Sequence, residues 1–212
     1  MEEEIIQPIS KEVLRSELTP EKLLRTTNKS HNDIYVVTAH NAPNVMREIG
    51  RLREIAFRAA GGGTGKAVDI DEFDTSDNCY KQLIVWNPEA EEIIGGYRYL
   101  FGRNWRLNAD GQPEVAPSHM FHFSDRFLQE YMPYTVELGR SFVSLDYQNV
   151  RKNSKSIFAL DNLWPEQGTG DASGQIPSAV GSRRGRHCRR FVFQNPAAQF
   201  KRDMRCRRKL PA

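Results

Sequence analysis

The amino-acid sequence predicts an α/β fold, in which a mixed and mostly antiparallel sheet is flanked by helices. Between residues 43 and 60, apolar side chains recur at spacings of four, three and four, which is typical of a helix with one buried face. Residues 80–86 and 91–100 are rich in strand-forming side chains and are joined by a short link with turn chemistry, which indicates an antiparallel hairpin. A chain of 212 residues can bury one sizeable core, so we expect one domain.

The N-terminal residues 1–30 are polar and are expected to form an arm that precedes the core. A short helix is expected over residues 19–24, because Thr19 can cap it and Pro20 suits its first position. Residues 34–39 are rich in β-branched side chains and predict a strand.

The main helix is expected to begin at Pro43 and to end at the glycines 61–63. After the hairpin, the sequence predicts a polar loop, a short helix and a strand, over residues 103–117, 125–131 and 135–143. Ser124 can cap the short helix, and Pro133 ends it. A further helix is expected from Ser154 or Ser156 through Leu163.

The character of the sequence changes after Trp164. In residues 165–212, Leu, Ile, Val and Phe number seven of 48, and neither a helical nor a strand period is visible. We therefore expect residues 31–164 to form the core, with a sheet that is incomplete on its C-terminal side, and residues 165–212 to be a disordered or poorly packed basic tail. A shifted reading frame would produce such an abrupt change.

The net charge of +3 conceals an uneven distribution. Residues 181–212 hold 11 Lys and Arg and one acid, which gives +10, whereas the first 180 residues hold 19 bases and 26 acids, which gives −7. Such a polycationic segment binds anionic surfaces without specificity, so it allows peripheral contact with an anionic membrane and implies no specific nucleic acid.

Targeting and metal signals are missing from the sequence. No apolar stretch approaches the ~20 residues of a membrane span, and the start, MEEEIIQP, is acidic where a signal peptide is basic, so we expect a cytoplasmic protein. Cys79, Cys188 and Cys206 are odd in number and lack metal-binding spacing, so neither a disulfide framework nor a zinc site is indicated.

Charged residues interrupt the predicted apolar segments. They are Arg53 in the helix, Asp69, Asp71 and Asp74 in VDIDEFD, Arg98 in the hairpin, and Glu137 and Arg140 in the last strand. VDIDEFD alternates apolar and acidic residues, which is strand-like, and an exposed turn with solvated carboxylates is the alternative. An unpaired buried ion costs several kcal/mol, so these charges need each other or a ligand. A structural salt-bridge network and a functional site both satisfy that requirement.

Two glycine-containing motifs have contrasting interpretations. In ELGR, Gly139 permits a bulge that would bring Glu137 and Arg140 to one side of the strand and free backbone N–H groups for an oxyanion. GGGTGK, residues 61–66, fails as a phosphate loop, because Ala60 and Ala67 replace its first glycine and its hydroxyl residue. We interpret it as a helix end followed by a flexible loop.

Four motifs in a fixed order carry a resemblance to a known family. They are LR-x3-F (Leu52, Arg53, Phe57), D-x-D-x-x-D (with Asp71 and Asp74), G-x-R-x-L (Gly96, Arg98, Leu100) and ELGR (Glu137 to Arg140). From about Ile34 to Trp164 the chain resembles the acyl-carrier-protein-dependent N-acyltransferases, a GNAT-like branch that includes acyl-homoserine-lactone synthases. The segments MREIGRLRE, YKQLIVW and SIFALDNLW are most similar to ornithine and glycine aminolipid synthases, some of which carry a hemolysin-like label.

The resemblance implies an enzyme that moves a fatty acyl group, 3-hydroxylated in this branch, from acyl carrier protein to the amine of a small amino acid. It implies no bound cofactor. Glu137 would orient or deprotonate the amine, and its ordinary pKa of ~4.3 must rise for that task. Arg98 and Arg140 would fix the substrate carboxylate, Arg53 and Phe57 would shape the acceptor site, and Asp71 and Asp74 would pair with arginines or hold the ammonium group.

The donor is inferred from the segment that follows the last predicted strand. Residues 148–155 lack the glycines that hold the pyrophosphate of coenzyme A, and Arg151, Lys152 and Lys155 would meet the acidic surface of a carrier protein. A solvated basic loop is the alternative for these three residues. The alternatives for the whole chain are an inactive, truncated acyltransferase-like domain with an adventitious tail, and an acyl-homoserine-lactone synthase.

Overall fold

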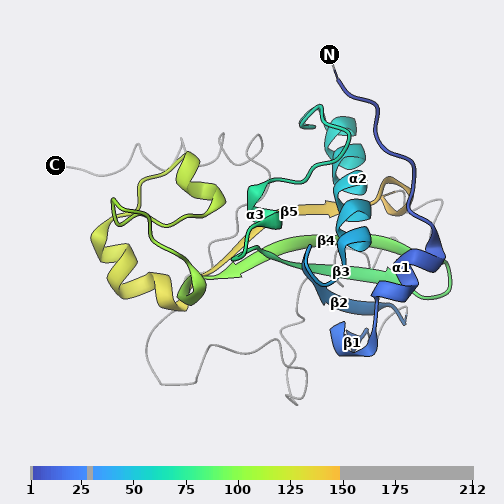
Figure 1. Ribbon diagram of the computed structural model, residues 1–212, viewed down its shortest axis with the longest axis horizontal. Helices are drawn as coiled ribbons and strands as arrows, with labels where there is room; N and C mark the ends of the chain where they lie inside the picture. Colours follow the sequence, from blue (N-terminus) through green and yellow to red (C-terminus); the bar gives the residue numbers. More distant parts are fainter. Residues whose placement is uncertain (1, 28–30, 149–212) are drawn as a thin grey trace, which may run out of the picture.

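The computed structural model describes residues 2–27 and 31–148, and it contains an open sheet of five antiparallel strands in the order β1-β2-β3-β4-β5 (Figure 1). The strands are β1 (Leu23–Thr26), β2 (Asp33–Val37), β3 (Lys81–Asn87), β4 (Glu92–Phe101) and β5 (Val136–Val143). The predicted α/β class with a mostly antiparallel sheet is confirmed, as are the β3–β4 hairpin and the strands at β2 and β5.

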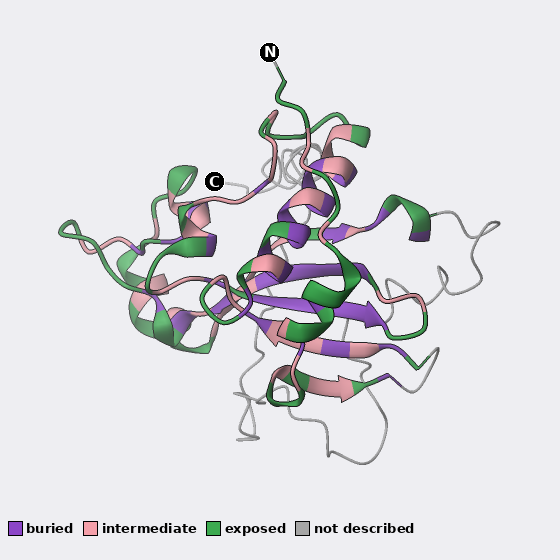
Figure 2. Ribbon diagram, turned by 45° about the vertical axis from the view of Figure 1, so that its right-hand side comes forward, coloured by how far each residue is buried: buried purple, intermediate pink, exposed green. Residues whose placement is uncertain are grey.

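Helix α2 (Pro43–Ala59) crosses one face of the sheet, as Figure 1 shows, and confirms the predicted amphipathic helix. Its apolar residues, among them Val45 and Ile49, pack against Ile84, Trp86 and Phe142 of the sheet in the main core. Figure 2 shows the resulting layer, with buried residues concentrated on α2, β3 and β4. No helix of the described residues is long and apolar enough to cross a membrane.

The N-terminal region packs onto this core more closely than its polar sequence suggests. Helix α1 (Lys11–Glu17) buries Leu14, and Leu18 joins the same cluster. The helix expected over residues 19–24 is wrong: a 3-10 turn, η1 (Pro20–Lys22), leads into β1, where Leu23 pairs with Tyr35. Pairing with β2 satisfies the backbone groups that the helix would have bonded.

Between β4 and β5 the chain forms a separate lobe, which lies to the left of the sheet in Figure 1. It consists of short turns and helices: η2 (Gly102–Asn104), η3 (Ala116–His119), η4 (Phe127–Tyr131) and η5 (Met132–Tyr134). The helix expected after Ser124 is present, partly wound as a π-helix, and the Ser124 hydroxyl accepts from Phe127 N at 3.3 Å. Trp105 and Val115 join the lobe to Tyr80 in a second apolar cluster. A last turn, η6 (Leu145–Tyr147), follows β5.

Candidate active site

The acidic segment VDIDEFD is a loop followed by one helical turn, so its strand-like interpretation is wrong. Asp71 is the N-cap of α3 (Glu72–Thr75), and its carboxylate accepts from the N–H groups of Phe73 and Asp74. The Asp74 carboxylate accepts in turn from Asp71 N at 3.3 Å. This reciprocal cap outweighs the alternating pattern, because it satisfies the free N–H groups of the first helical turn.

Arg53 and Asp74 form the innermost ion pair, and neither side chain has any exposed surface. Arg53 Nη1 lies 3.2 Å from Asp74 Oδ2, and Arg53 Nη2 donates to the side-chain oxygen of Gln82. Gln82 Nε2 donates to Asp74 Oδ1 at 2.8 Å, which closes a triangle between α2, α3 and β3. Arg53 and Asp74, which were both predicted to bind substrate, are therefore enclosed by protein and bind to each other and to Gln82.

Arg98 and Arg140 extend the network toward solvent. Arg98 Nη1 donates to Asp71 Oδ1 at 2.7 Å and lies 3.2 Å from Asp74 Oδ2. Arg140 Nε lies 3.3 Å from Asp69 Oδ2, and its Nη2 donates to Asp71 Oδ2 at 3.4 Å. Three arginines thus face three aspartates. The Arg140 side chain is 34% exposed and that of Asp71 is 18% exposed, so the network opens to solvent at these two residues.

The environments of the aspartates shift their pKa values in opposite directions. Burial raises the pKa of Asp69, even though Arg140 and Arg53 act against it. Burial also acts on Asp71, but the hydrogen bond from Arg98 and the charges of the arginines together hold its pKa below the ordinary value. Asp71 is therefore ionised at neutral pH.

Strand β5 contains the bulge that the sequence predicts. Gly96 pairs with Phe142 and Arg98 pairs with Gly139, so two residues of β5 oppose the single residue Tyr97 of β4. The left-handed conformation falls on Arg140, with φ 50°, and not on Gly139. The bulge brings Arg140 onto the face that carries Glu137, and both now lie beside Asp71.

Glu137 is a buried carboxyl group, 6% exposed, that lies beside the ion network without an arginine of its own. Among the described residues, no Lys or Arg lies within 4.0 Å of its carboxyl oxygens. Burial and the nearby negative charge of Asp71 raise the pKa of Glu137 to about 8. The Tyr80 hydroxyl contacts Glu137 Oε2. This is the upward shift that a carboxylate needs to exchange a proton with an amine near neutral pH.

Several residues of the site were not indicated by the sequence. Tyr80 and Gln82 lie just before and within β3, and the glutamine inside the apolar run YKQLIVW was the available signal. Arg98 also stacks on the Tyr80 ring, with its guanidinium carbon 4.9 Å from the ring centroid. Phe57 is half-buried and packs against the main core. The predicted carrier-protein contacts Arg151, Lys152 and Lys155, the helix near Leu163 and the basic tail 165–212 lie outside the described residues.

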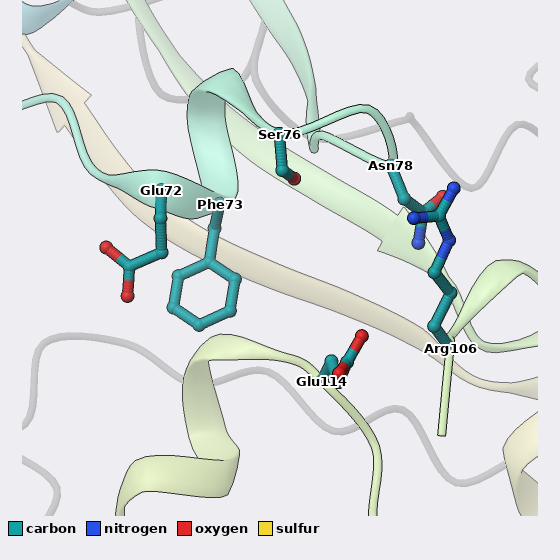
Figure 3. Close-up of a pocket in the computed structure, with 6 residues that line it drawn as sticks. All are labelled: Glu72, Phe73, Ser76, Asn78, Arg106 and Glu114. Carbon is teal, nitrogen blue, oxygen red and sulfur yellow. The ribbon is translucent and has the colours of Figure 1, made fainter. Parts of the chain in front are cut away.

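A pocket of about 190 Å³ lies beside Phe73 (Figure 3). Its lining combines two acids, one arginine and two small polar side chains around the Phe73 ring: Glu72, Glu114, Arg106, Ser76 and Asn78. Side chains of both charges thus line this pocket. No group of His, Cys, Asp and Glu side chains suited to a metal ion occurs in the described part of the chain.

The loop 61–66 confirms the interpretation of GGGTGK as a helix end. Gly61 has φ 77°, and Gly62 N donates back to Phe57 O at 2.8 Å. The N–H groups of Thr64 and Gly65 both donate to the buried carboxylate of Glu54, at 3.0 and 2.8 Å. A carboxylate of the protein therefore occupies the place at which a phosphate loop holds its anion.

Comparison with known proteins first indicates the class. The acetyltransferase (GNAT) domain family matches residues 52–155, which include the C-terminal half of α2, the acidic loop and β3 to β5. Together with the sheet and helices described above, this match shows that residues 52–155 are similar to GNAT acetyltransferase domains. No solved structure matches the chain.

The particular relatives are glycine N(alpha)-acyltransferases. Those of Phocaeicola vulgatus and Bacteroides thetaiotaomicron are each 68% identical to this chain over 162 residues, which is 76% of the chain. The match covers 50% and 48% of those two proteins, so the chain spans about half the length of the curated relatives it matches.

Proposed function

We propose that this chain carries an N-acyltransferase site that moves a fatty acyl group from a carrier-protein thioester to the amine of glycine, in the synthesis of an aminolipid. The observation that carries the proposal is the Glu137 carboxyl group, whose pKa is raised to about 8 and which lies at the β5 bulge beside a network of three arginines and three aspartates. The identity with glycine N(alpha)-acyltransferases supports the choice of acceptor. The carrier-protein donor, the 3-hydroxyl group on the acyl chain and the aminolipid product rest on the sequence resemblance.

In the proposed reaction, ionised Glu137 accepts one proton from the glycine ammonium group. The amine nitrogen then forms a bond to the thioester carbonyl carbon, and the oxyanion is held by backbone N–H groups at the bulge. The C–S bond breaks as the oxyanion collapses. The thiol leaves with a proton from the attacking nitrogen, so that amide, thiol and one proton borne by Glu137 are the products.

Arg140 is the proposed partner of the glycine carboxylate. Its Nε and Nη2 face Asp69 and Asp71, and the side chain is 34% exposed, so Nη1 is the nitrogen that we assign to the glycine carboxylate. The pocket beside Phe73 offers Arg106 for the same purpose. Glycine saturation kinetics of Arg140→Lys and Arg106→Gln separate the two positions: the proposal expects the KM for glycine to rise in the first variant and to stay unchanged in the second, and the reverse result would place the carboxylate in the pocket.

The donor is tested by comparing matched thioesters. Because residues 148–155 lack a glycine-bearing pyrophosphate loop, we expect kcat/KM to be higher with acyl carrier protein than with coenzyme A carrying the same acyl chain. Charge reversal at Arg151, Lys152 and Lys155 together should raise the KM for the carrier protein alone. Equal kcat/KM for the two donors would contradict this part of the proposal.

The whole proposal is tested with the purified chain, a labelled 3-hydroxyacyl carrier protein and a panel of amino acids. Formation of labelled acyl-glycine, in preference to products from other amino acids, supports it. The matched control is Glu137→Gln, which retains the shape of the side chain. A folded protein that forms no acylated amino acid would support the alternative of an inactive acyltransferase-like domain.

A further inference from the structure

Tyr80 is held rigidly beside the proposed base. It is 1% exposed, and its backbone N–H donates to Phe73 O at 2.8 Å, which ties it to α3. Its ring meets the edge of Phe73, with centroids 5.9 Å apart, and the guanidinium of Arg98 covers its face at 4.9 Å. The ring therefore has no freedom to rotate its hydroxyl group away from Glu137.

The hydroxyl group of Tyr80 has two partners with fixed roles. The backbone N–H of Ala116 donates to it at 3.2 Å, and a backbone N–H can only donate. The proton of the hydroxyl is consequently left for Glu137 Oε2, the second partner. A chain of hydrogen bonds thus runs from Ala116, in the lobe between β4 and β5, through Tyr80 to Glu137.

This arrangement distinguishes the two carboxyl oxygens. Oε2 is engaged by Tyr80, whereas Oε1 lies beside Gly139, where a Cβ atom would be 3.6 Å from it. Oε1 therefore lies at the bulge beside Gly139, and the same Cβ atom would be in ordinary contact with Arg98 Nε at 3.5 Å. A hydrogen bond donated to a carboxylate also favours its ionised form, which opposes the effects of burial and Asp71.

We propose that Tyr80 is a positioning residue that holds Glu137 by Oε2, so that Oε1 receives the proton of the acceptor amine at the β5 bulge. The inference rests on the proposed role of Glu137 as the base. The charged groups around Glu137 are Asp71 from the α3 cap, Arg98 from β4 and Arg140 from β5. None of them is altered when the Tyr80 hydroxyl is removed.

The test is Tyr80→Phe, which keeps the ring on Arg98 and removes only the hydroxyl. Hydrogen bonds to charged groups are worth about one pKa unit or more, so the acidic limb of the kcat/KM profile should move to higher pH by about one unit. Tyr99→Phe is the matched control, since Tyr99 is a half-buried tyrosine on the other face of β4. Tyr99→Phe should leave the acidic limb of the kcat/KM profile at its wild-type pH.

A readout without turnover makes the test independent of activity. Carbon-13 NMR of side-chain-labelled glutamate, with the Glu137 resonance identified by its loss in Glu137→Gln, follows the carboxyl group through its titration. The midpoint should be near 8 in the wild type and higher in Tyr80→Phe. An unchanged midpoint and an unchanged limb in a Tyr80→Phe protein that only melts earlier would overturn the inference.

The two proposals fail in different ways. If Glu137→Gln keeps full turnover, the assignment of the base is wrong, whatever Tyr80→Phe does. If Glu137→Gln loses turnover while Tyr80→Phe has a wild-type limb and midpoint, only the role of Tyr80 is wrong. In the double variant, Tyr80→Phe should cause no further loss beyond Glu137→Gln, because both changes act through one carboxyl group.

Discussion

Glu137 differs from the other acids of the cluster in what surrounds its carboxyl group. The three aspartates each have an arginine within 4 Å, whereas Glu137 has burial, a negative neighbour and a tyrosine hydroxyl. A carboxyl group with its pKa raised to about 8 costs the folded protein stability as pH rises from about 4.5 to 8, because the unfolded chain releases its proton first. The residue suited to act as a base is therefore a source of instability.

Glu137→Gln should accordingly have opposite effects on activity and on stability. Turnover should fall by a factor on the order of 10²–10⁴, as for other general bases, because the amide cannot accept the proton. The melting temperature at pH 8 should rise, because no charge is buried, and the rise should vanish near pH 4. Turnover and thermal unfolding at both pH values check this. A lower melting temperature with normal turnover would indicate a purely structural residue.

Sequence reasoning missed Tyr80 and Gln82, and each of them pairs with a residue that lies far away in the sequence. Glu137 and Tyr80 are 57 positions apart, and Arg53 and Gln82 are 29 apart, so their pairing depends on the sheet and on the packing of α2. Arg98, Glu137 and Arg140 were found because charges inside strand patterns are unusual. A tyrosine next to a strand is ordinary, so nothing in the sequence distinguished Tyr80 before the fold was known.

At the scale of the elements, Glu54 anchors the end of α2 to the following loop. Its carboxylate has no exposed surface and accepts from Thr64, Gly65 and Arg58, and these bonds outweigh burial and lower its pKa to about 2. A depressed pKa contributes stability that is present above pH 4.5 and is lost as pH falls toward 2.

Glu54→Gln should therefore cost on the order of 3 kcal/mol at neutral pH and much less near pH 2. Chemical denaturation across this pH range measures the difference. Glu4→Gln, at an exposed position of the N-terminal arm, is the control and should change stability little across this range. An equal loss of stability at pH 7 and pH 2 would show that shape, and not charge, is what Glu54 contributes.

Gly50 lies in the middle of α2 where the acidic loop touches the helix. Asp69 N donates to Gly50 O at 3.0 Å, and a Cβ atom at this position would be 2.7 Å from Ile70 Cγ1. Gly50→Ala should lower the melting temperature, although alanine favours a helix by about 1 kcal/mol. Ile70→Ala removes this close contact, so the double variant should recover part of the melting temperature that Gly50→Ala loses. A higher melting temperature in the single variant would mean that the loop moves aside without cost.

The elements themselves were predictable where one pattern dominated. Helix α2 and strands β2 to β5 follow from their periodicity and their turns, and all are confirmed. The acidic segment failed, because alternation of Val68, Ile70 and Phe73 with acids imitates a strand, while the capping ability of Asp71 decides the structure. Strand β1 was not predicted, because a strand of four residues at a sheet edge shows almost no periodic pattern.

At the scale of the whole molecule, the ion network joins elements that are far apart in the sequence. Arg53 from α2 meets Asp74 from α3 and Gln82 from β3, and the same aspartate meets Arg98 from β4. Removing one member of a buried pair leaves an uncompensated charge, which costs about 3–5 kcal/mol.

Arg53→Met should consequently destabilise the entire described domain in one cooperative transition. The loss should be about 3 kcal/mol or more by chemical denaturation, and Arg53→Met with Asp74→Asn should lose less than the sum of the two single variants. Arg47→Met, at an exposed position of the same helix, is the control. Additive losses would show that the two residues are not coupled.

The balance of three arginines against three aspartates has a consequence for how an acceptor binds. The pKa of Glu137 is raised to about 8, so near neutral pH the cluster alternates between a state with protonated Glu137 and a state that is more negative by one charge, the −1 state. An ammonium group prefers the −1 state, and linkage is reciprocal, so glycine binding at pH 7 should release a fraction of a proton. Titration calorimetry in buffers of different ionisation enthalpy measures that fraction. It should be close to zero at pH 7 in Glu137→Gln, whereas a binding enthalpy of the wild type that is independent of buffer at pH 7 would place the ammonium group away from Glu137.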